Sequence, residues 1–439
     1  MKIKVLCITI AALMLMPVFA SCRQTPTAGT NGPESVTEEK TPASASESAA
    51  LPTSGTQETS PSETETGKSE TPTPTETPTP PEKRVSFLAA GDNIIHEAVF
   101  TDAKALAATQ ASQNGYTEKY YFDSMYNGVS ALIANADIAF VNHECPVAGE
   151  QYGISGYPSF NSPFEALEAL ERVGFDVLNL ANNHMLDMEG KCTGYQNTLA
   201  NAKKTNMLVI GGYTPEDYDD LRVIEKNGVK IAFLSYTDVM NGGRKKALHS
   251  GSNVTVPYAD ETTIRRQTAL ARANADFVVV SMHWGTENSF TVDKDQKKYA
   301  NLLNECGVDV ILGHHSHTIQ PVEWVGGGDH KTLCFWSLGN FLSTQHPIKN
   351  LTGIFGCFDF YIDDAGGKHI ENVRAVPHMT WYSMKRDSLQ VYLLANVTEE
   401  LISTHGSQLR TSDNGGNFTL STVKRYVEEQ VGQYLDYAV

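Results

Sequence analysis

Residues 308–315 have the sequence VDVILGHH, a short apolar strand that runs directly into two histidines. Other apolar runs end in the same way, just before Asn142, Asn183 and His283. Helix-like stretches separate these runs, and buried strands that alternate with helices predict a largely parallel sheet. Ligands of such sheets bind beyond the carboxyl ends of the strands. The pattern therefore predicts an α/β fold with a polar site at one edge of the sheet.

The expected elements follow from the same apolar patterns. Strands are expected at 85–90, 137–141, 175–180, 229–234, 277–280 and 308–312, and helices at 163–173, 261–275 and 293–306. Beyond Gly313 the pattern changes to strands joined by turns, at 318–325, 332–338, 353–362 and 371–378. We expect these later strands to form a second sheet packed on the first, followed by a final helix at 421–438.

The first 84 residues are expected to be a targeting signal and a tether. Residues 5–19 are almost wholly apolar and follow two lysines, as in a secretory signal. The end of this run, Phe19-Ala-Ser-Cys22, resembles the lipobox of bacterial lipoproteins, which predicts lipidation of Cys22; an ordinary cleaved signal is the alternative. Residues 23–84 are rich in Ser, Thr, Pro and Glu, which predicts a disordered tether. The expected domains are 1–22, 23–84, a main domain at 85–345, and strands and a helix at 346–439 that complete or pack on it.

The composition narrows the class of partner. The 439-residue chain has a formal net charge of −17, which argues against nucleic acid as a partner. Seven cysteines occur without a C-x-x-C motif, which argues against a thiolate zinc site. An acidic protein that handles an acidic polymer needs local positive charge, and Lys245, Lys246, Arg265 and Arg266 are candidates by clustering.

The residues that follow the strands have the chemistry of a metal site. A mixture of carboxylate, amide oxygen and imidazole suits a divalent cation such as Mn, Zn, Fe or Mg. Two cations ~3.5–4 Å apart would use about this number of ligands, including one bridging carboxylate. The candidates are Asp92, Asn142, Glu144, Asn183, His184, His283, His315 and His317.

Six motifs in order along residues 85–345 resemble those of the CapA poly-γ-glutamate capsule-synthesis family. They are Gly91-Asp92, Asn142-x-Glu144, Ala181-Asn-Asn-His-x-x-Asp187, His283-Trp-Gly-x-Glu287, His315-x-His317 and Ser337-Leu-Gly-Asn-Phe341. That family is similar in fold to the calcineurin-like metallophosphoesterases. The resemblance implies a four-layer sandwich, in which helices flank two mixed β sheets, with a two-metal site at the strand ends.

The resemblance also implies a role for each residue. Asp92 and His317 would bind the first metal, Glu144 would bridge, and Asn183, His283 and His315 would bind the second metal. His184 would contact the phosphoryl oxygen or protonate the leaving group. Glu287 is open between a general base and a structural acceptor. Asn142 and Trp284 are candidates for substrate binding, although a turn residue and a packing residue are the alternatives.

Several positions depart from the pattern or have a simpler interpretation. Ile94 stands where the phosphoesterases have a histidine, with His96 two residues further on. Ser316 replaces the usual proline of the loop, a change that removes no ligand. The other interpretations are that His143 is an exposed neighbour, that Asp187 caps a helix, that His314 is not a ligand, and that Asn340 bonds backbone in a structural turn.

Two functions of different classes remain open. The first is a metal-dependent hydrolase of the cell surface, acting on an anionic polymer or its phosphorylated precursor. For this function the resemblance implies synthesis, export or anchoring of a capsule such as poly-γ-glutamate. The second is a non-catalytic polymer-binding scaffold in a capsule-synthesis membrane complex. Either protein would be extracytoplasmic and held to the cell membrane by its lipid anchor.

Overall fold

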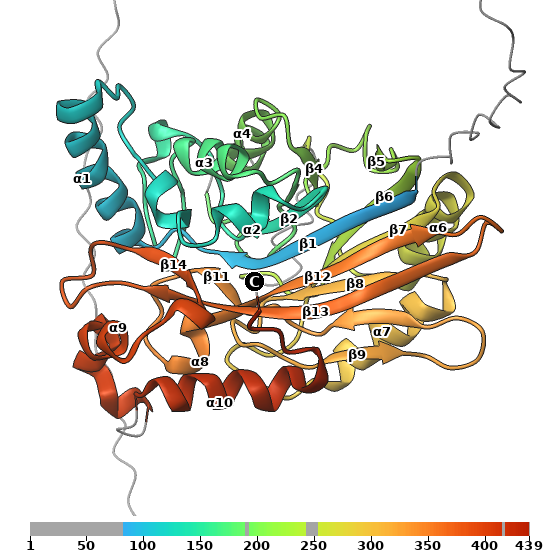
Figure 1. Cartoon of the computed structure of the whole chain (residues 1–439). Coiled ribbons are helices and arrows are strands. Elements are labelled where there is room, and N and C mark those ends of the chain that lie inside the picture. The colour runs from blue at the N-terminus through green and yellow to red at the C-terminus, as the bar shows by residue number, and fades with distance from the viewer. Residues whose placement is uncertain (1–81, 189–192, 243–252, 415–417, 439) are drawn as a thin grey trace, which may run out of the picture. The chain divides into compact units, whose positions relative to one another are not determined.

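The computed structural model describes residues 82–188, 193–242, 253–414 and 418–438, all of which lie in the unit Thr77–Val439 (Figure 1). The signal segment, Cys22 and the tether up to residue 81 lie outside the described residues. None of the helices in the described ranges combines the length and the apolar character that crossing a membrane requires.

One sheet has eight strands in the order β14-β13-β12-β1-β2-β3-β4, with β11 pairing β1 beyond this path. Its strands are β1 (Lys83–Asn93), β2 (Ile138–His143), β3 (Val177–Asn179), β4 (Leu208–Ile210), β11 (Asn340–Leu342), β12 (Thr352–Ile362), β13 (Lys368–Trp381) and β14 (Gln390–Leu393). Strands β1 to β4 are parallel, and β12 to β14 extend the sheet in antiparallel fashion. The sheet is therefore mixed.

The second sheet has six strands in the order β5-β6-β7-β8-β10-β9. Its strands are β5 (Arg222–Lys226), β6 (Val229–Thr237), β7 (Phe277–His283), β8 (Val310–His314), β9 (Val322–Val325) and β10 (Thr332–Phe335). Strands β6, β7, β8 and β10 are parallel, whereas β5 and β9 are antiparallel edge strands. This sheet is also mixed.

The two sheets pack face to face through aromatic side chains. The ring of Phe87 on β1 stacks on Phe233 of β6 at 6.2 Å and on Phe358 of β12 at 5.0 Å. Phe335 on β10 also stacks on Phe358, at 6.0 Å. Buried aromatic rings contribute large apolar areas, so this layer holds the sheets together.

Helices cover the outer faces of both sheets (Figure 1). Their bounds are α1 (Glu97–Asn114), α2 (Ser130–Ala134), α3 (Glu165–Val173), α4 (Thr193–Ala202), α6 (Glu261–Asn274), α7 (Lys294–Glu305), α8 (Ile348–Leu351), α9 (Glu399–Thr404) and α10 (Leu420–Val431). Ile264 of α6 and Leu303 of α7 join one buried cluster with Val280 of β7. Asp293 and Gln296 form a capping box that begins α7. The expected four-layer architecture, two mixed sheets between helices, is confirmed.

The structure corrects two expectations about the later part of the chain. The later strands do not form a sheet of their own: β9 and β10 join β8, whereas β12 and β13 join β1. An apolar run identifies a strand but does not identify its partner, and the parallel strands themselves divide between the two sheets. The final helix is also shorter than expected, because it ends at Val431, before Gly432 with φ of 53°.

Candidate metal centre

The strand-end side chains of both sheets converge on one buried site. Asp92 lies near the end of β1, His283 ends β7, and Glu144 follows β2 with its amide bonded to the carbonyl of Asn93 at 3.1 Å. His315 and His317 follow β8. All these side chains are buried, so the site lies within the protein at the edge of both sheets.

Asp92, Glu144 and His317 form the first group of potential ligands, which we call the first metal group. Their ligand atoms lie within 4.8 Å of one another. Nδ1 of His317 is 3.3 Å from Oδ2 of Asp92, and Nε2 of the same ring is 3.8 Å from Oε1 of Glu144. The ring of His317 thus lies between the two carboxylates.

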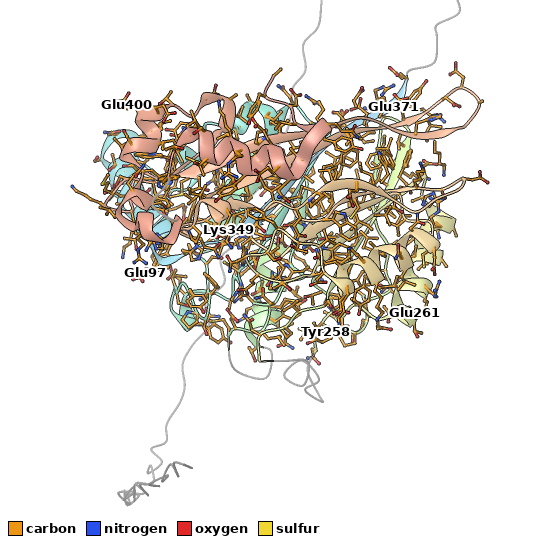
Figure 2. All side chains as sticks on the ribbon, turned by 90° about the horizontal axis from the view of Figure 1, so that it is seen from below. Glu97, Tyr258, Glu261, Lys349, Glu371 and Glu400 are labelled. Atoms are coloured by element: carbon orange, nitrogen blue, oxygen red, sulfur yellow. The ribbon has the colours of Figure 1, made fainter. Side chains whose placement is uncertain are left out.

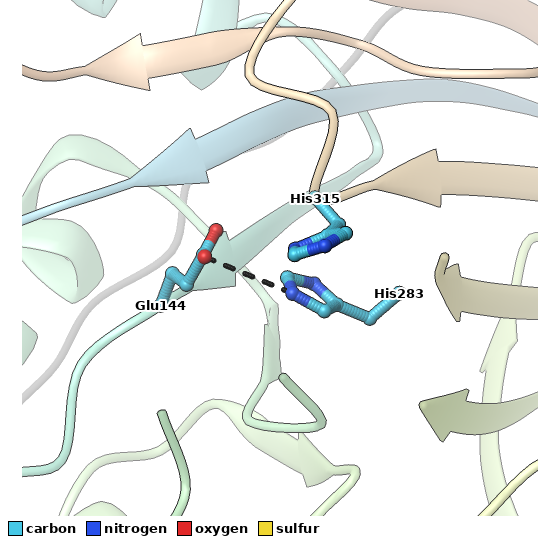
Figure 3. A group of neighbouring side chains, drawn as sticks. All are labelled: Glu144, His283 and His315. Atoms are coloured by element: carbon cyan, nitrogen blue, oxygen red, sulfur yellow. Dashed lines mark ion pairs between the residues drawn. The ribbon is translucent and has the colours of Figure 1, made fainter. Parts of the chain in front are cut away.

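Glu144, His283 and His315 form the second metal group (Figure 3). Nε2 of His283 is 3.7 Å from Oε1 of Glu144, and the rings of His283 and His315 are 4.7 Å apart. The amide oxygen of Asn183 lies 3.0 Å from Nε2 of His283, so it faces the same group. Glu144 belongs to both groups, which is the arrangement of a bridging carboxylate.

Unsatisfied buried atoms show that these residues fit a cation. Both carboxylate oxygens of Glu144 and the Nδ1 atoms of His283 and His315 are buried without a hydrogen-bond partner. Burial, and then the charge of Asp92, hold the pKa of Glu144 well above its usual range. A divalent cation among these atoms would satisfy them and favour the ionised form of Glu144, because opposite charge stabilises a carboxylate.

A chain of polar side chains holds Asp92 in place. Burial alone would raise the pKa of Asp92, but the adjacent rings of His314 and His317 outweigh it and keep that pKa well below its usual range. Nδ1 of His314 lies 3.2 Å from Oδ1 of Asp92. Asn142 donates to the same oxygen at 2.7 Å and accepts from Asn179 at 2.8 Å. His314 is outside both metal groups, as expected, but its contact with Asp92 was not predicted.

His184 and its neighbours stand beside the second metal group. Nδ1 of His184 lies 2.6 Å from Oδ2 of Asp187, and the amide nitrogen of Asn241 lies 3.1 Å from the same Nδ1. Asn241 also accepts from Asn183 at 3.2 Å, which ties the histidine to the ligand set. The carboxylate of Asp187 accepts from His184 and from the amide of Phe160. The expected helix cap falls on residues 189–192, which lie outside the described residues.

The loop after β8 has an unusual backbone. His315 and His317 have φ of 87° and 55°, in the left-handed region that residues other than glycine seldom occupy. Asn340 holds this loop from the side, because its amide oxygen lies 3.0 Å from Nδ1 of His317 and its nitrogen donates to the carbonyl of Asn350. The backbone-bonding role expected for Asn340 is confirmed. Such strained conformations commonly occur where side chains are aimed at a ligand.

The segment after Asp92 places no imidazole in the first metal group. Ile94 is buried, and His96 belongs to neither group. His96 accepts the amide hydrogen of Thr344 at 3.3 Å. Burial, and then the nearby charges of His317 and Arg386, lower the pKa of His96 to about 3. The ring is therefore neutral near pH 7.

Four other candidate residues lie in the following environments. His143 is fully buried rather than exposed, and bonds Asn93 and Ser162 at 3.0 Å each. Trp284 is 1% exposed and stacks on Trp336, and Asn142 is fully buried; neither has surface left for a substrate contact. Glu287 is exposed on the loop after β7.

The proposed basic cluster is also corrected. Arg265 pairs with Glu261 and Glu305, and Arg266 pairs with Asp219, so both charges on α6 are neutralised by neighbours. Lys245 and Lys246 lie outside the described residues. Clustering in sequence could not show these pairings.

Comparison with known proteins places the chain among capsule-synthesis proteins. A model of the family "Bacterial capsule synthesis protein PGA_cap" matches residues 86–345. PGA biosynthesis protein CapA of Bacillus subtilis (strain 168) is 32% identical over 54% of this chain and 65% of its own length. Capsule biosynthesis protein CapA of Bacillus anthracis is 30% identical over 52% of this chain and 55% of its own. The chain therefore spans less than two-thirds of the length of these curated relatives.

Two solved structures show a more distant likeness. A hypothetical protein from Thermus thermophilus is 15% identical with a TM-score of 0.36, covering 66% of this chain and 99% of its own. Haemophilus influenzae NAD nucleotidase (NadN) is 11% identical with a TM-score of 0.39, covering 79% of this chain and 59% of its own. Since the family match covers more than half of the chain and contains every residue of the two metal groups, this protein belongs to the bacterial capsule synthesis protein PGA_cap family.

Proposed function

We propose that this protein is a metal-dependent hydrolase of the cell surface that takes part in making or anchoring an anionic capsule polymer such as poly-γ-glutamate. The observation that carries the proposal is Glu144, a buried carboxylate without hydrogen-bond partners that is shared by two groups of potential ligands. A structural metal site needs no carboxylate shared between two cations, whereas two-metal hydrolases are built around a shared carboxylate.

The names of the relatives support the polymer part of the proposal. The Bacillus relatives are named for PGA biosynthesis and for capsule biosynthesis. The polymer itself, its phosphorylated precursor and a membrane complex that makes it are the proposed partners. The proposed location is outside the cytoplasm, with lipid on Cys22 as the anchor and residues 23–84 as the spacer.

The chain supplies a cation site and a proton donor. A bound divalent cation would lower the pKa of water and polarise the oxygen of a phosphoester or an amide. Asp92, Glu144 and His317 would hold one cation, and Asn183, His283 and His315 would complete the site for a second. In hydrolysis the water oxygen loses a proton to solvent and bonds to phosphorus or to the carbonyl carbon. The bond to the leaving oxygen or nitrogen breaks, and that leaving atom takes a proton. His184 is placed to give that proton, because Asp187 orients its ring.

A scaffold function is favoured by one observation. Ile94 stands where a first-metal histidine is expected, so the first metal group has only three His, Asp or Glu members. A weakly held first cation would leave a polymer-binding protein with a structural metal. This alternative keeps the second metal group but predicts no turnover.

Metal analysis combined with an assay separates the two functions. The folded protein is reconstituted with Mn, Zn or Fe, its metal content is measured, and the same sample is tested on an aryl phosphodiester and on poly-γ-glutamate. Metal-dependent hydrolysis of either substrate supports the enzyme. A fully loaded protein that hydrolyses neither would favour the scaffold, and a protein that holds no metal would overturn the centre itself.

A further inference from the structure

A cavity of about 600 Å³ opens at the start of α1, outside the two metal groups. Its walls come from the start of α1, from the loop at Tyr157 and from the turn between β13 and β14. The residues that the argument uses are His96, Glu97, Tyr157, Lys385, Arg386 and Asp387. The turn at 385–387 lies beyond residues 86–345, so this wall is outside the family motifs.

Short contacts connect the cavity with the candidate catalytic histidine. The ring of Phe160 makes edge-to-face contacts with His96 at 5.5 Å and with His184 at 4.7 Å. A single aromatic ring thus separates the cavity wall from His184. On the other side, Thr344 donates its amide to His96 and accepts from Arg386 at 3.0 and 2.8 Å. A ligand in this cavity would therefore be separated from His184 by the rings of His96 and Phe160.

Arg386 has an unusual charge environment. Its Nη2 bonds only neutral oxygens of Thr344, and its Nε is buried without a partner. Every other arginine in the described ranges, apart from Arg410, forms an ion pair with a carboxylate. The guanidinium of Arg386 therefore has no carboxylate partner among the described residues, and a ligand carboxylate in the cavity would supply one, because guanidinium and carboxylate groups pair well.

The acidic groups of the same wall are engaged elsewhere or lie at its rim. Asp102 accepts the amides of Ser388 and Leu389 at 3.0 and 2.8 Å, which fixes the turn that carries Arg386. Asp387 accepts from the hydroxyl of Ser383. Glu97 is exposed and lies at the outer margin of the molecule in Figure 2. Lys385 is exposed, and neither it nor Arg386 has an ion pair among the described residues.

We infer that this cavity is a subsite for a carboxylate of the polymer chain, with Arg386 as its anchor and Lys385 as a second positive charge. A γ-linked glutamate chain carries one free carboxylate on each residue, so a residue further along the chain from the cleaved bond presents such a group. The ring of Tyr157, which is 77% exposed at the rim, would cover the aliphatic part of the chain. The inference rests on the proposed function and names how the substrate is held.

The test compares binding of two probes to the metal-loaded protein. One probe is a synthetic oligo-γ-glutamate, and the other is the same oligomer with every free carboxylate amidated. We expect the acidic oligomer to bind and the amidated one to bind at least tenfold more weakly. Arg386→Gln should weaken binding of the acidic oligomer by about 10-fold to 100-fold, as for loss of a charge-assisted hydrogen bond. Arg386→Lys and Lys385→Gln should weaken it less.

The control is Arg425→Gln, which removes an arginine that is paired with Glu429 on α10. This variant should bind the acidic oligomer like the wild type, and metal content and thermal unfolding show whether each variant is folded. If Arg386→Gln does not fold, Arg386→Lys and Lys385→Gln carry the test, together with the salt dependence of binding. The subsite alone would be overturned if substitution of Arg386 and Lys385 left binding of the acidic oligomer unchanged. It would also be overturned if the amidated oligomer bound the wild type as tightly as the acidic one. Absence of wild-type binding to either oligomer, with hydrolysis also absent, would overturn the proposed function together with it.

Discussion

Oδ2 of Asp187 accepts hydrogen bonds from two groups, the ring of His184 at 2.6 Å and the amide of Phe160 at 2.9 Å. The carboxylate therefore fixes both the histidine and the aromatic residue against which it packs. Asp187 thus connects the candidate catalytic histidine with Phe160, which packs against the cavity wall at His96. A change at Asp187 should therefore disturb the placement of both rings.

His184→Ala should keep its metal but lose ~10²–10³ in rate, the typical cost of losing a contact made in the transition state. The reason is that His184 belongs to neither metal group. Asp187→Asn should also retain metal and lose part of the rate, because the ring keeps its place but not its orientation. Hydrolysis of an aryl phosphodiester and metal content are measured on the same samples, with the exposed His369→Ala as control. Loss of metal from His184→Ala would make the assigned role wrong.

Glu144→Gln should reduce metal content more than any variant of a histidine ligand. Glu144 belongs to both metal groups, whereas His317 belongs only to the first and His283 only to the second. His317→Ala and His283→Ala should each reduce the metal bound in a single group. Elemental analysis after reconstitution with Mn, Zn or Fe measures the effect. Equal losses in Glu144→Gln and His317→Ala would contradict the bridging position.

His378→Leu should make the protein less sensitive to acid. His378 is fully buried against Phe341 and Phe355, and burial lowers its pKa to about 3. In the unfolded chain a histidine has a pKa of about 6.5, so between about 6.5 and about 3 only the unfolded state binds the proton. The free energy of unfolding therefore decreases as pH falls through this window.

The measurement for His378 is urea unfolding at several pH values, with a chelator present so that metal binding does not contribute. The stability difference between wild type and His378→Leu should shift in favour of the variant as pH falls, by at most about 1.4 kcal/mol per pH unit. His369→Leu is the control, since His369 is exposed beside Asp363. If the free energies of unfolding of wild type and His378→Leu changed with pH in parallel, the prediction would be contradicted.

Asp102→Ala should destabilise the protein by about 1–3 kcal/mol, the usual cost of leaving a buried amide without its acceptor. The side chain of Asp102 is buried and accepts the amides of Ser388 and Leu389. Asp102→Asn retains one acceptor oxygen and should cost less. Asp363→Ala is a matched control, because Asp363 also accepts two backbone amides but in a loop exposed to water. Urea unfolding measures all three, and equal effects at Asp102 and Asp363 would be evidence against this explanation.

Acylation of Cys22 is tested by mass spectrometry of the mature N-terminus. We expect a lipid-modified Cys22, and Cys22→Ser should release the protein from the membrane fraction. A free amine on a different residue would show an ordinary cleaved signal. Limited proteolysis of the same sample should cut within residues 23–84 and leave a resistant core that starts near Val85.

The sequence predicted the site better than it predicted the sheets. Polar residues at strand ends converge in any parallel arrangement, so Asp92, Glu144 and His283 could be grouped without knowledge of strand order. The side-chain contacts that surround those residues were not predictable, because each contact depends on which way the side chains point. His314 contacts Asp92, and Asn241 connects Asn183 with His184, although no spacing in the sequence links them. The position of Asp187 three residues after His184 was the one local signal of their contact.

The position of β1 inside its sheet has a consequence for how the protein folds. β1 pairs with β12 along its length, from Lys83 opposite Ile362 to Ala89 opposite Gly356, so this strand is completed only by a segment far along the chain. A fold with such distant pairings has a high contact order and forms slowly, and until β12 arrives β1 presents an open strand edge. Asp92 lies beyond this pairing, opposite Asn142 of β2 and Asn340 of β11, and β11 is also a segment far along the chain. We therefore expect the metal centre to assemble late, once these distant segments have come together.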